Sequence, residues 1–289
     1  MRNLIIILMF FPFINTFACD NCGGGGLGLD ANILSANNGN AIGLLVEAQH
    51  YKTFVEGRKQ RNYLFNYTLN GSYTPHQKVQ LKFYLPLYLQ ANRTEQTNSF
   101  GLGDAVILST YTPLDKQKVE KEIRHRLSFS GGIKLPTGLY KNDIEAITTT
   151  IPFGSKSWDF ILGTSYAFKV KNYILSSNVM GKITTTNQYD FKFGNSFETS
   201  IQNSYKIDVK DAQLYPFIGV KFNWQTNDIS NNFYRIYTGG YLFSEVMGLQ
   251  FNYYKYKLAF NTEIPFSQHL NNIDLVTGNT YTIQFTYQF

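Results

Sequence analysis

The final ten residues constrain the fold more than any other stretch. Aromatic and apolar residues occupy every second position of 280–289, from Tyr281 to Phe289, and uncharged polar residues fill the positions between them. Such an alternation without exception is typical of a β-strand with one apolar and one polar face. The edges of a strand need partners. A sheet closed into a barrel, in which the last strand pairs with the first, would supply them within the chain.

The composition agrees with a membrane barrel. Aromatic residues make up 16% of the 289 residues, with 24 Phe and 21 Tyr, yet only 43% of the chain is hydrophobic. A transmembrane barrel hides its apolar residues in alternation, while aromatic girdles raise the Phe and Tyr content. The net charge is +6, but the basic residues are scattered along the sequence. Nucleic-acid binding requires a concentrated basic patch, so we expect no nucleic-acid partner.

Residues 1–18 have the features of an export signal. Arg2 precedes an apolar run from Leu4 to Phe17, and Thr16 and Ala18 place small residues at the positions before a cleavage site. No later stretch approaches the run of about 18 apolar residues that a transmembrane helix requires. If the mature chain spans a membrane, it must do so with strands.

Residues 19–40 are rich in Cys and Gly, so we expect a flexible segment there, ahead of the predicted barrel at 41–289. Cys19 and Cys22 are the only cysteines, and four glycines follow them. In an exported chain, the simplest interpretation is a small disulfide. Capture of copper or zinc by the two thiolates, which supply half of a tetrahedral site, is a second possibility. Lipidation of Cys19 is a third. We expect no cofactor.

The alternation recurs along the chain and predicts an all-β, antiparallel, up-and-down transmembrane barrel of about 12 strands. The strands lie near 41–51, 63–73, 79–90, 100–112, 123–135, 158–170, 173–185, 191–207, 214–225, 241–253, 255–266 and 280–289. Long and short connections alternate, as they do in outer-membrane barrels whose long loops lie outside the cell. The connection at 114–122 is the exception, because it is longer than its periplasmic side would require.

Strand parity also predicts which side chains face the lumen. If the apolar faces contact lipid, the alternating polar residues line the interior. The charged residues expected there are Glu47, Lys82, Arg124, Arg126, Lys134, Asp159, Lys182, Glu198, Lys221 and Glu263. Both signs occur in a narrow lumen, so these residues either pair with one another and stiffen the barrel or line a passage. Parity is ambiguous at 101–108 and 241–248, where β-bulges would fit.

The sequence offers little for catalysis. An outer-membrane hydrolase needs a nucleophile beside a histidine, but none of His50, His76, His125 and His269 has a serine two residues later. His125 and Ser128 would lie on opposite faces of a strand. His269 and Asp274 share a loop, where we interpret them as surface residues. We therefore expect no enzymatic activity.

Several short motifs fall at the ends of predicted strands. They are Phe100-Gly-Leu-Gly-Asp104, Gly131-Gly-Ile-Lys-Leu-Pro-Thr-Gly138, Gly154-Ser-Lys-Ser-Trp-Asp159, Gly248-Leu-Gln-Phe251 and Asn261-Thr-Glu-Ile-Pro-Phe266. In this order, the set resembles the transporter-like outer-membrane barrels grouped under the phenol-degradation meta-pathway family. The resemblance implies an outer-membrane protein that passes small molecules, aromatic or hydrophobic ones among them.

The resemblance implies roles for residues at the barrel rim: Gly101, Gly103, Asp104, Lys134, Pro136, Gly138, Trp158 and Asp159. Physically, glycines permit turns and close approach of backbones, proline ends a strand without a donor and tryptophan suits a membrane interface. A purely conformational role at the rim explains the same residues without transport.

The sequence thus predicts a passive channel for small molecules in the outer membrane of a bacterium with two membranes. The alternative is a non-transporting envelope protein with a metal-binding or anchoring role through Cys19 and Cys22. The expected partners are outer-membrane lipid, the small-molecule solute and the barrel-assembly machinery. The terminal Phe289 resembles the signal by which that machinery recognises outer-membrane barrels.

Overall fold

The computed structural model describes residues 39–55, 58–94, 96–118, 122–139, 153–236, 238–270 and 275–289. Every regular element in these ranges is a β-strand, as predicted. The strands are β1 (Ala41–Val55), β2 (Arg58–His76), β3 (Val79–Asn92), β4 (Thr97–Leu102), β5 (Val106–Lys118), β6 (Ile123–Lys134), β7 (Asp159–Val170), β8 (Tyr173–Thr184), β9 (Phe191–Lys192), β10 (Ser196–Tyr205), β11 (Ile207–Val209), β12 (Ala212–Gln225), β13 (Ile229–Ser230), β14 (Phe233–Tyr234), β15 (Gly240–Tyr253), β16 (Tyr256–Leu270) and β17 (Leu275–Gln288).

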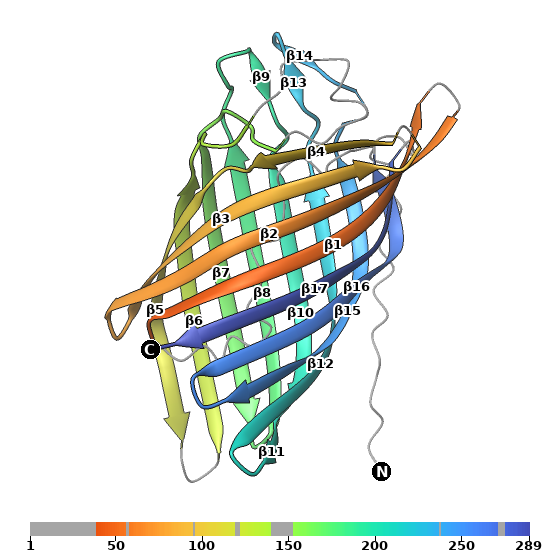
Figure 1. The fold of residues 1–289 in the computed structure, drawn as a ribbon. Coiled ribbons are helices and arrows are strands. Elements are labelled where there is room, and N and C mark those ends of the chain that lie inside the picture. Colours follow the sequence, from red (N-terminus) through yellow and green to blue (C-terminus); the bar gives the residue numbers. More distant parts are fainter. Residues whose placement is uncertain are drawn as a thin grey trace, which may run out of the picture.

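Twelve of these strands close into an antiparallel barrel (Figure 1). The ring order is β1, β2, β3, β5, β6, β7, β8, β10, β12, β15, β16 and β17, and β17 pairs back onto β1. In that closing pair, Ala41 lies opposite Gln288 and Leu44 opposite Phe285. The final strand therefore pairs with the first, as its alternating pattern predicted.

The outward face of the barrel is apolar. On the closing pair, Leu44, Ile283 and Phe285 are exposed on the outside, whereas Thr280 and Thr282 are buried on the inside. The same alternation runs around the barrel because lipid can solvate apolar side chains but cannot satisfy polar ones. Among the described residues, no helix is long and apolar enough to cross a membrane.

The two ends of the barrel differ in their connections. At one end, neighbouring strands are joined by tight turns such as those at Lys171 and Tyr254, whose positive φ angles of 53° and 49° allow a sharp reversal. We call this the short-turn end. The opposite end, which we call the long-loop end, carries β4 and a three-stranded sheet of β9, β13 and β14 above the barrel (Figure 1).

Four predicted boundaries were wrong. The strand predicted at 100–112 is two separate elements. β4 pairs with β3, and β5 begins at Val106 after residues 103–105, which belong to no strand. The strand predicted at 191–207 consists of β9, β10 and β11. Much of the connection predicted at 114–122 is strand, since β5 runs to Lys118, and β17 begins at Leu275 rather than Thr280. Hydrogen bonding to neighbouring strands continues these elements beyond the residues at which the apolar–polar alternation of the sequence stops.

Candidate functional site

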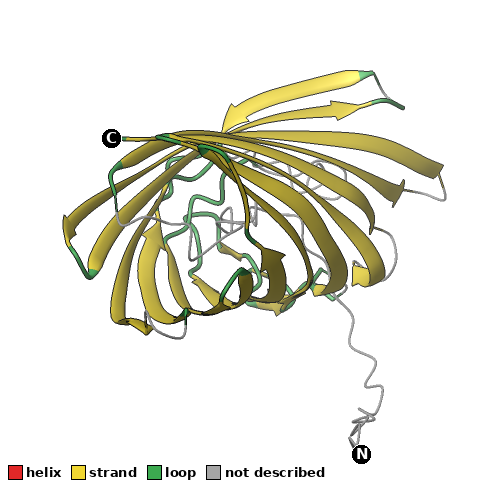
Figure 2. Ribbon diagram, turned by 90° about the horizontal axis from the view of Figure 1, so that it is seen from below, coloured by secondary structure: helices red, strands yellow, loops and turns green. Residues whose placement is uncertain are grey.

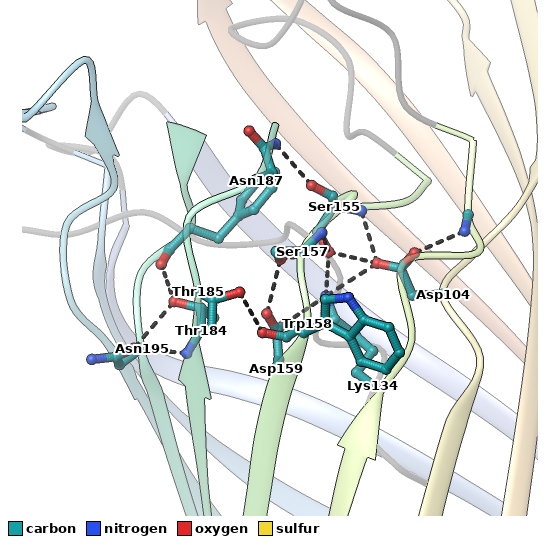
Figure 3. Close-up of polar contacts among 12 residues, drawn as sticks. Asp104, Lys134, Ser155, Ser157, Trp158, Asp159, Thr184, Thr185, Asn187 and Asn195 are labelled. Atoms are coloured by element: carbon teal, nitrogen blue, oxygen red, sulfur yellow. Dashed lines mark hydrogen bonds and ion pairs between the residues drawn. The ribbon is translucent and has the colours of Figure 1, made fainter. Parts of the chain in front are cut away.

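Five polar residues form a buried network at the long-loop end of the barrel, which we call the rim network: Asp104, Lys134, Ser155, Ser157 and Asp159 (Figure 3). Lys134 is the last residue of β6, and Asp159 is the first residue of β7. Asp104 lies between β4 and β5, and the two serines lie in the loop that enters β7. The Lys134 Nζ is 2.6 Å from Asp159 Oδ2 and 3.2 Å from Asp104 Oδ2. One ammonium group thus joins carboxylates from two separate segments.

Hydrogen bonds from the loops complete the rim network. Asp104 Oδ2 accepts bonds from the Ser155 hydroxyl at 2.6 Å and the Ser155 amide at 2.8 Å, while its Oδ1 accepts the Gly138 amide at 2.8 Å. The Ser157 hydroxyl donates to Asp159 Oδ1 at 2.8 Å. Charge-assisted bonds of this kind are stronger than neutral ones. Asp104 therefore fastens both ends of the β6–β7 loop, at Gly138 and Ser155, to the barrel.

The motif glycines lie where two backbones meet. A Cβ added to Gly154 would lie 2.5 Å from the Cα of Gly138, and one added to Gly138 would lie 2.6 Å from the Cα of Gly154. Gly103 differs, because a Cβ there would meet side chains, with the Pro86 Cγ at 2.8 Å. The structure thus brings together three motifs that are far apart in the sequence, at 100–104, 131–138 and 154–159. Of the other motif positions, Gly101 is buried in β4, Pro136 lies in the loop that leaves β6, and Trp158 is exposed before β7.

A second charged group lies inside the barrel. Lys221 on β12 is 3.1 Å from Glu263 on β16 and 3.4 Å from Glu198 on β10, measured from Nζ to the nearest carboxylate oxygen. Glu47 on β1 interacts electrostatically with all three. We call these four residues the lumen cluster. Three carboxyl groups surround one ammonium group, and all four residues were predicted to face the lumen.

The remaining predicted lumen residues lie elsewhere. Arg124 forms a two-point pair with Asp115 near the short-turn end, with Nε–Oδ1 and Nη2–Oδ2 distances of 2.7 and 2.8 Å, and the buried Arg126 lies 4.0 Å from the same carboxylate. Lys82 lies opposite Leu108 across β3 and β5, and Lys182 lies opposite Ile161 across β7 and β8. The ten residues therefore belong to separate places along the lumen rather than to one site.

The lumen is also partly apolar, which corrects the expectation that alternating polar residues line it. Val106, Leu108 and Ile161 form a buried cluster against which Tyr84 and Met180 pack. A second cluster, comprising Tyr51, Leu64, Tyr88, Phe153, Leu270 and Leu275, fills the long-loop end. Residues inside a barrel are shielded from lipid and can pack against one another, so parity does not require them to be polar. Strand alternation alone could not show that these apolar side chains face the lumen.

Further side chains were missed or misplaced by sequence reasoning. Ser155 and Ser157 lie in a loop, where no periodicity marks them. Glu245 lies on the lipid-facing side of β15, since its direct neighbours Val220 and Ile264 occupy that face and Val220 is 52% exposed. Phe243, Leu249 and Phe251 are exposed on this same face, so alternation along β15 is unbroken, and the register shift between Phe243 and Ser244 adds its extra residue to β16. This shift lies in the stretch whose parity was ambiguous.

The histidines are dispersed. His76 lies at the end of β2, next to the tight turn to β3; His50 packs against Gly278; His125 lies 2.8 Å from the Tyr166 hydroxyl; and His269 stacks on Tyr241. Among the described residues, no group of three or more His, Cys, Asp or Glu side chains could hold a metal ion. Cys19, Cys22 and Asp274 lie outside these residues, so the predictions about them remain predictions.

Comparisons with known proteins support the fold. No family model matches the chain, and no curated protein sequence matches it. Among solved structures, the COG4313 outer membrane channel from Pseudomonas putida F1 aligns with a TM-score of 0.69 at 14% identity, over 87% of this chain and 96% of that one. The chain therefore has the fold of an outer-membrane channel. Its membership of the phenol-degradation meta-pathway family remains a prediction.

Two autotransporter barrels resemble the chain less closely. The translocator domain of NalP from Neisseria meningitidis aligns with a TM-score of 0.47 at 8% identity, over 91% of both chains. The β domain of the Bordetella autotransporter BrkA aligns with a TM-score of 0.49 at 9% identity, over 87% of this chain and all of that one. We draw no functional conclusion from these two.

Proposed function

We propose that the protein is an outer-membrane channel through which small molecules, aromatic or hydrophobic ones among them, pass by passive diffusion. The observation that carries this proposal is the two-sided lumen. Apolar side chains from β3, β5, β7 and β8 gather on one arc of the ring, beside Lys82 and Lys182, whereas the lumen cluster occupies the arc from β10 through β16 to β1.

This arrangement suits solutes with an apolar body. Small-molecule sites are usually lined by hydrophobic and aromatic groups, with a few polar groups that orient the ligand. Tyr84, Leu108 and Met180 supply the apolar surface, and the lumen cluster supplies the polar one. A barrel whose charges served only to stiffen it would not need an apolar patch on the opposite arc.

The rim network contributes by positioning the loop that enters β7. Through Asp104 it fixes Ser155 and Gly138, and Phe153 from the same loop stacks on Tyr88 inside the barrel at a centroid distance of 6.1 Å. Loop segments lie within the outline of the barrel when it is viewed from below (Figure 2). We infer that these loops restrict the long-loop mouth and so limit the size of the solute.

The proposed orientation places the short-turn end in the periplasm and the long-loop end outside the cell, because outer-membrane barrels have short periplasmic turns and longer external loops. Lipid then surrounds the apolar outward face. Phe289 lies at the short-turn end, where its amide donates to the Asn40 carbonyl at 3.0 Å.

Solute flux in proteoliposomes tests the proposal. The purified protein is reconstituted into vesicles, and the entry of small uncharged aromatic solutes is compared with entry into protein-free vesicles. We expect faster entry that declines as the solute becomes larger. Entry at the protein-free rate for every solute, together with no ionic current in planar bilayers, would overturn the proposal.

A further inference from the structure

A row of uncharged polar side chains lines the inner face of β1, β2 and β3 at the long-loop end of the barrel, where these strands lie side by side (Figure 1). Its members are amides and one hydroxyl, each at most 8% exposed: Thr53, Gln60, Asn62, Gln90 and Asn92. Thr53 lies opposite Gln60 across β1 and β2, and Asn62 lies opposite Asn92 across β2 and β3. We call these five residues the amide row. Polar groups buried in this way need hydrogen-bond partners.

Two amides of the row are bonded at one end only. The Asn62 Nδ2 donates to the Thr53 hydroxyl oxygen at 3.2 Å, and the Gln90 Nε2 donates to the Tyr51 hydroxyl oxygen at 2.5 Å. Their carbonyl oxygens, Asn62 Oδ1 and Gln90 Oε1, are buried and have no hydrogen-bond partner in the part of the chain that the structure describes. Each of these oxygens could therefore accept a hydrogen bond from a ligand.

The two unpartnered oxygens belong to neighbouring side chains. Gln90 lies opposite Leu64 in the ladder of β2 and β3, so Asn62 and Gln90 are diagonal neighbours on one face. Asn62 is 0% exposed and Gln90 is 2% exposed. A buried acceptor without a donor destabilises the fold, whereas an apolar side chain of similar shape does not. Leu64 shows that this wall accommodates an apolar side chain, so stability alone does not account for two adjacent amides.

Aromatic and apolar side chains surround the two amides. Tyr51, Leu64, Tyr88 and Phe153 belong to the buried cluster that fills the long-loop end. Tyr88 lies two residues before Gln90 on β3 and therefore on the same face. Its ring stacks on Phe153 at a centroid distance of 6.1 Å and an interplanar angle of 9°. Apolar walls with a few polar groups that fix orientation are typical of small-molecule sites.

The surroundings select a neutral ligand. The amide row contains no charged side chain, and an ammonium group buried beside it would lose its hydration without gaining a carboxylate. A hydroxyl or an amide N–H loses much less hydration free energy on burial, and a hydrogen bond to a carbonyl oxygen offsets that loss. The chemistry of the site therefore fits a small neutral molecule with an apolar body and one hydrogen-bond donor.

We propose that Asn62 and Gln90 form a solute-binding site in the long-loop mouth. Their carbonyl oxygens accept hydrogen bonds from a hydroxyl or amide group of the solute, and Tyr88 and Phe153 contact its apolar body. The inference rests on the proposed channel function and deepens it, because it names the chemical group by which the channel selects among small molecules. Phe153 belongs to the loop that the rim network positions, so that network also shapes this site.

Equilibrium binding of two isomers tests the site. Benzyl alcohol and anisole contain the same atoms and one aromatic ring, but only the alcohol carries a hydrogen-bond donor. Binding of each to the purified protein in detergent micelles is measured by ligand-observed NMR, and each affinity is expressed relative to partition into protein-free micelles. We expect the alcohol to bind about fivefold more tightly than anisole, as one net hydrogen bond would give.

Matched variants test the two acceptors. Gln90→Met and Asn62→Leu each replace an amide by an apolar group of similar size, and each should weaken binding of the alcohol severalfold without weakening that of anisole. Either variant suffices if the other does not fold. Gln250→Met makes the same change at a buried glutamine of β15, which bonds to Asn252 at 2.7 Å, and should leave both affinities at the wild-type level.

The outcomes distinguish the site from the channel function. Equal relative affinities of the wild type for the two isomers would refute the site, and so would equal losses of alcohol binding in the Gln90 and Gln250 variants. Solute flux is measured separately. Flux without preferential binding of the alcohol refutes the site and leaves the channel in place. Binding that depends on Asn62 and Gln90 in a protein that passes no solute refutes the channel and leaves the site in place.

Discussion

Lys134 and Asp159 form a buried ion pair at the junction of β6 and β7, with 2.6 Å between Nζ and Oδ2 and with side chains only 7% and 0% exposed. Asp104 shares the same ammonium group at 3.2 Å. A buried charge needs such partners because it has lost its hydration. A single substitution in this pair should therefore have a large effect on the stability of the barrel.

Replacing Lys134 with methionine should destabilise the barrel. The change leaves two buried carboxylates without their cation, and loss of one partner of a buried pair costs about 3–5 kcal/mol. The free energy of unfolding, measured by denaturant titration in lipid vesicles with tryptophan fluorescence as the probe, would show it. Lys78→Met, at an exposed tight turn, is the matched control and should stay near the wild-type value. Equal losses in the two variants would contradict the role of the rim network.

The close approach of Gly138 and Gly154 predicts a second effect. Gly154→Ala would force a Cβ to within 2.5 Å of a backbone atom, and overpacking of this kind costs about 1–3 kcal/mol. Gly181→Ala is the control, because no atom lies within 4 Å of its added Cβ. We expect a lower denaturation midpoint for the first variant alone. A shift of the same size in the denaturation midpoints of both variants would show that the contact between Gly138 and Gly154 does not stabilise the barrel.

Glu245 and Glu263 lie on adjacent strands but on opposite faces, so the same substitution should act in opposite directions. Glu245→Leu removes a carboxylate from the lipid-facing side and should stabilise the barrel by about 1 kcal/mol, because charges on that face are unfavourable. Glu263→Leu removes a partner of Lys221 and should destabilise it. The free energy of unfolding of each variant in lipid vesicles measures both effects. Destabilisation by Glu245→Leu would mean that its carboxylate has a favourable partner.

Deletion of Phe289 should impair insertion more than transport. Its ring is 65% exposed and its amide bonds to the Asn40 carbonyl, so its loss changes the end of β17 but not the lumen. We expect less protein in the membrane and an unchanged flux per inserted molecule. Quantitative blotting of membrane fractions, normalised for expression, is the measurement. Equal membrane levels of the deletion and the wild type would refute the role of the terminal aromatic residue.

The sequence predicted the barrel, its strand number and the closing pair because lipid imposes alternation on every strand. It also placed Lys134, Asp159, Glu198 and Lys221 on strands whose parity turns them inward. It could not predict the contact between Asp104 and Ser155, which are 51 residues apart and meet only because the loop that enters β7 lies against the segment between β4 and β5. Local alternation contains no information about such loops.

Irregular places in the strands account for the other differences between the predicted and the observed side-chain positions. The interruption between β4 and β5 sets the parity that places Val106 and Leu108 inside, and the register shift beside Phe243 adds an extra residue to β16. Gln268 was assigned to a loop because the alternation ends before it, whereas in the structure it bridges two strands. Interrupted periodicity marks these places, although it does not say which way the side chains turn.

Passage through the lumen is the central claim, and solute entry into vesicles containing a narrowed lumen tests it most directly. Leu108→Trp places a large ring in the apolar arc, while Ile107→Trp places the same ring on the lipid-facing side, where Ile107 is 47% exposed. At matched amounts of inserted protein, we predict wild-type entry of small aromatic solutes for Ile107→Trp and a severalfold slower rate for Leu108→Trp. Equal rates in all three proteins, or rates no faster than in protein-free vesicles, would contradict the claim.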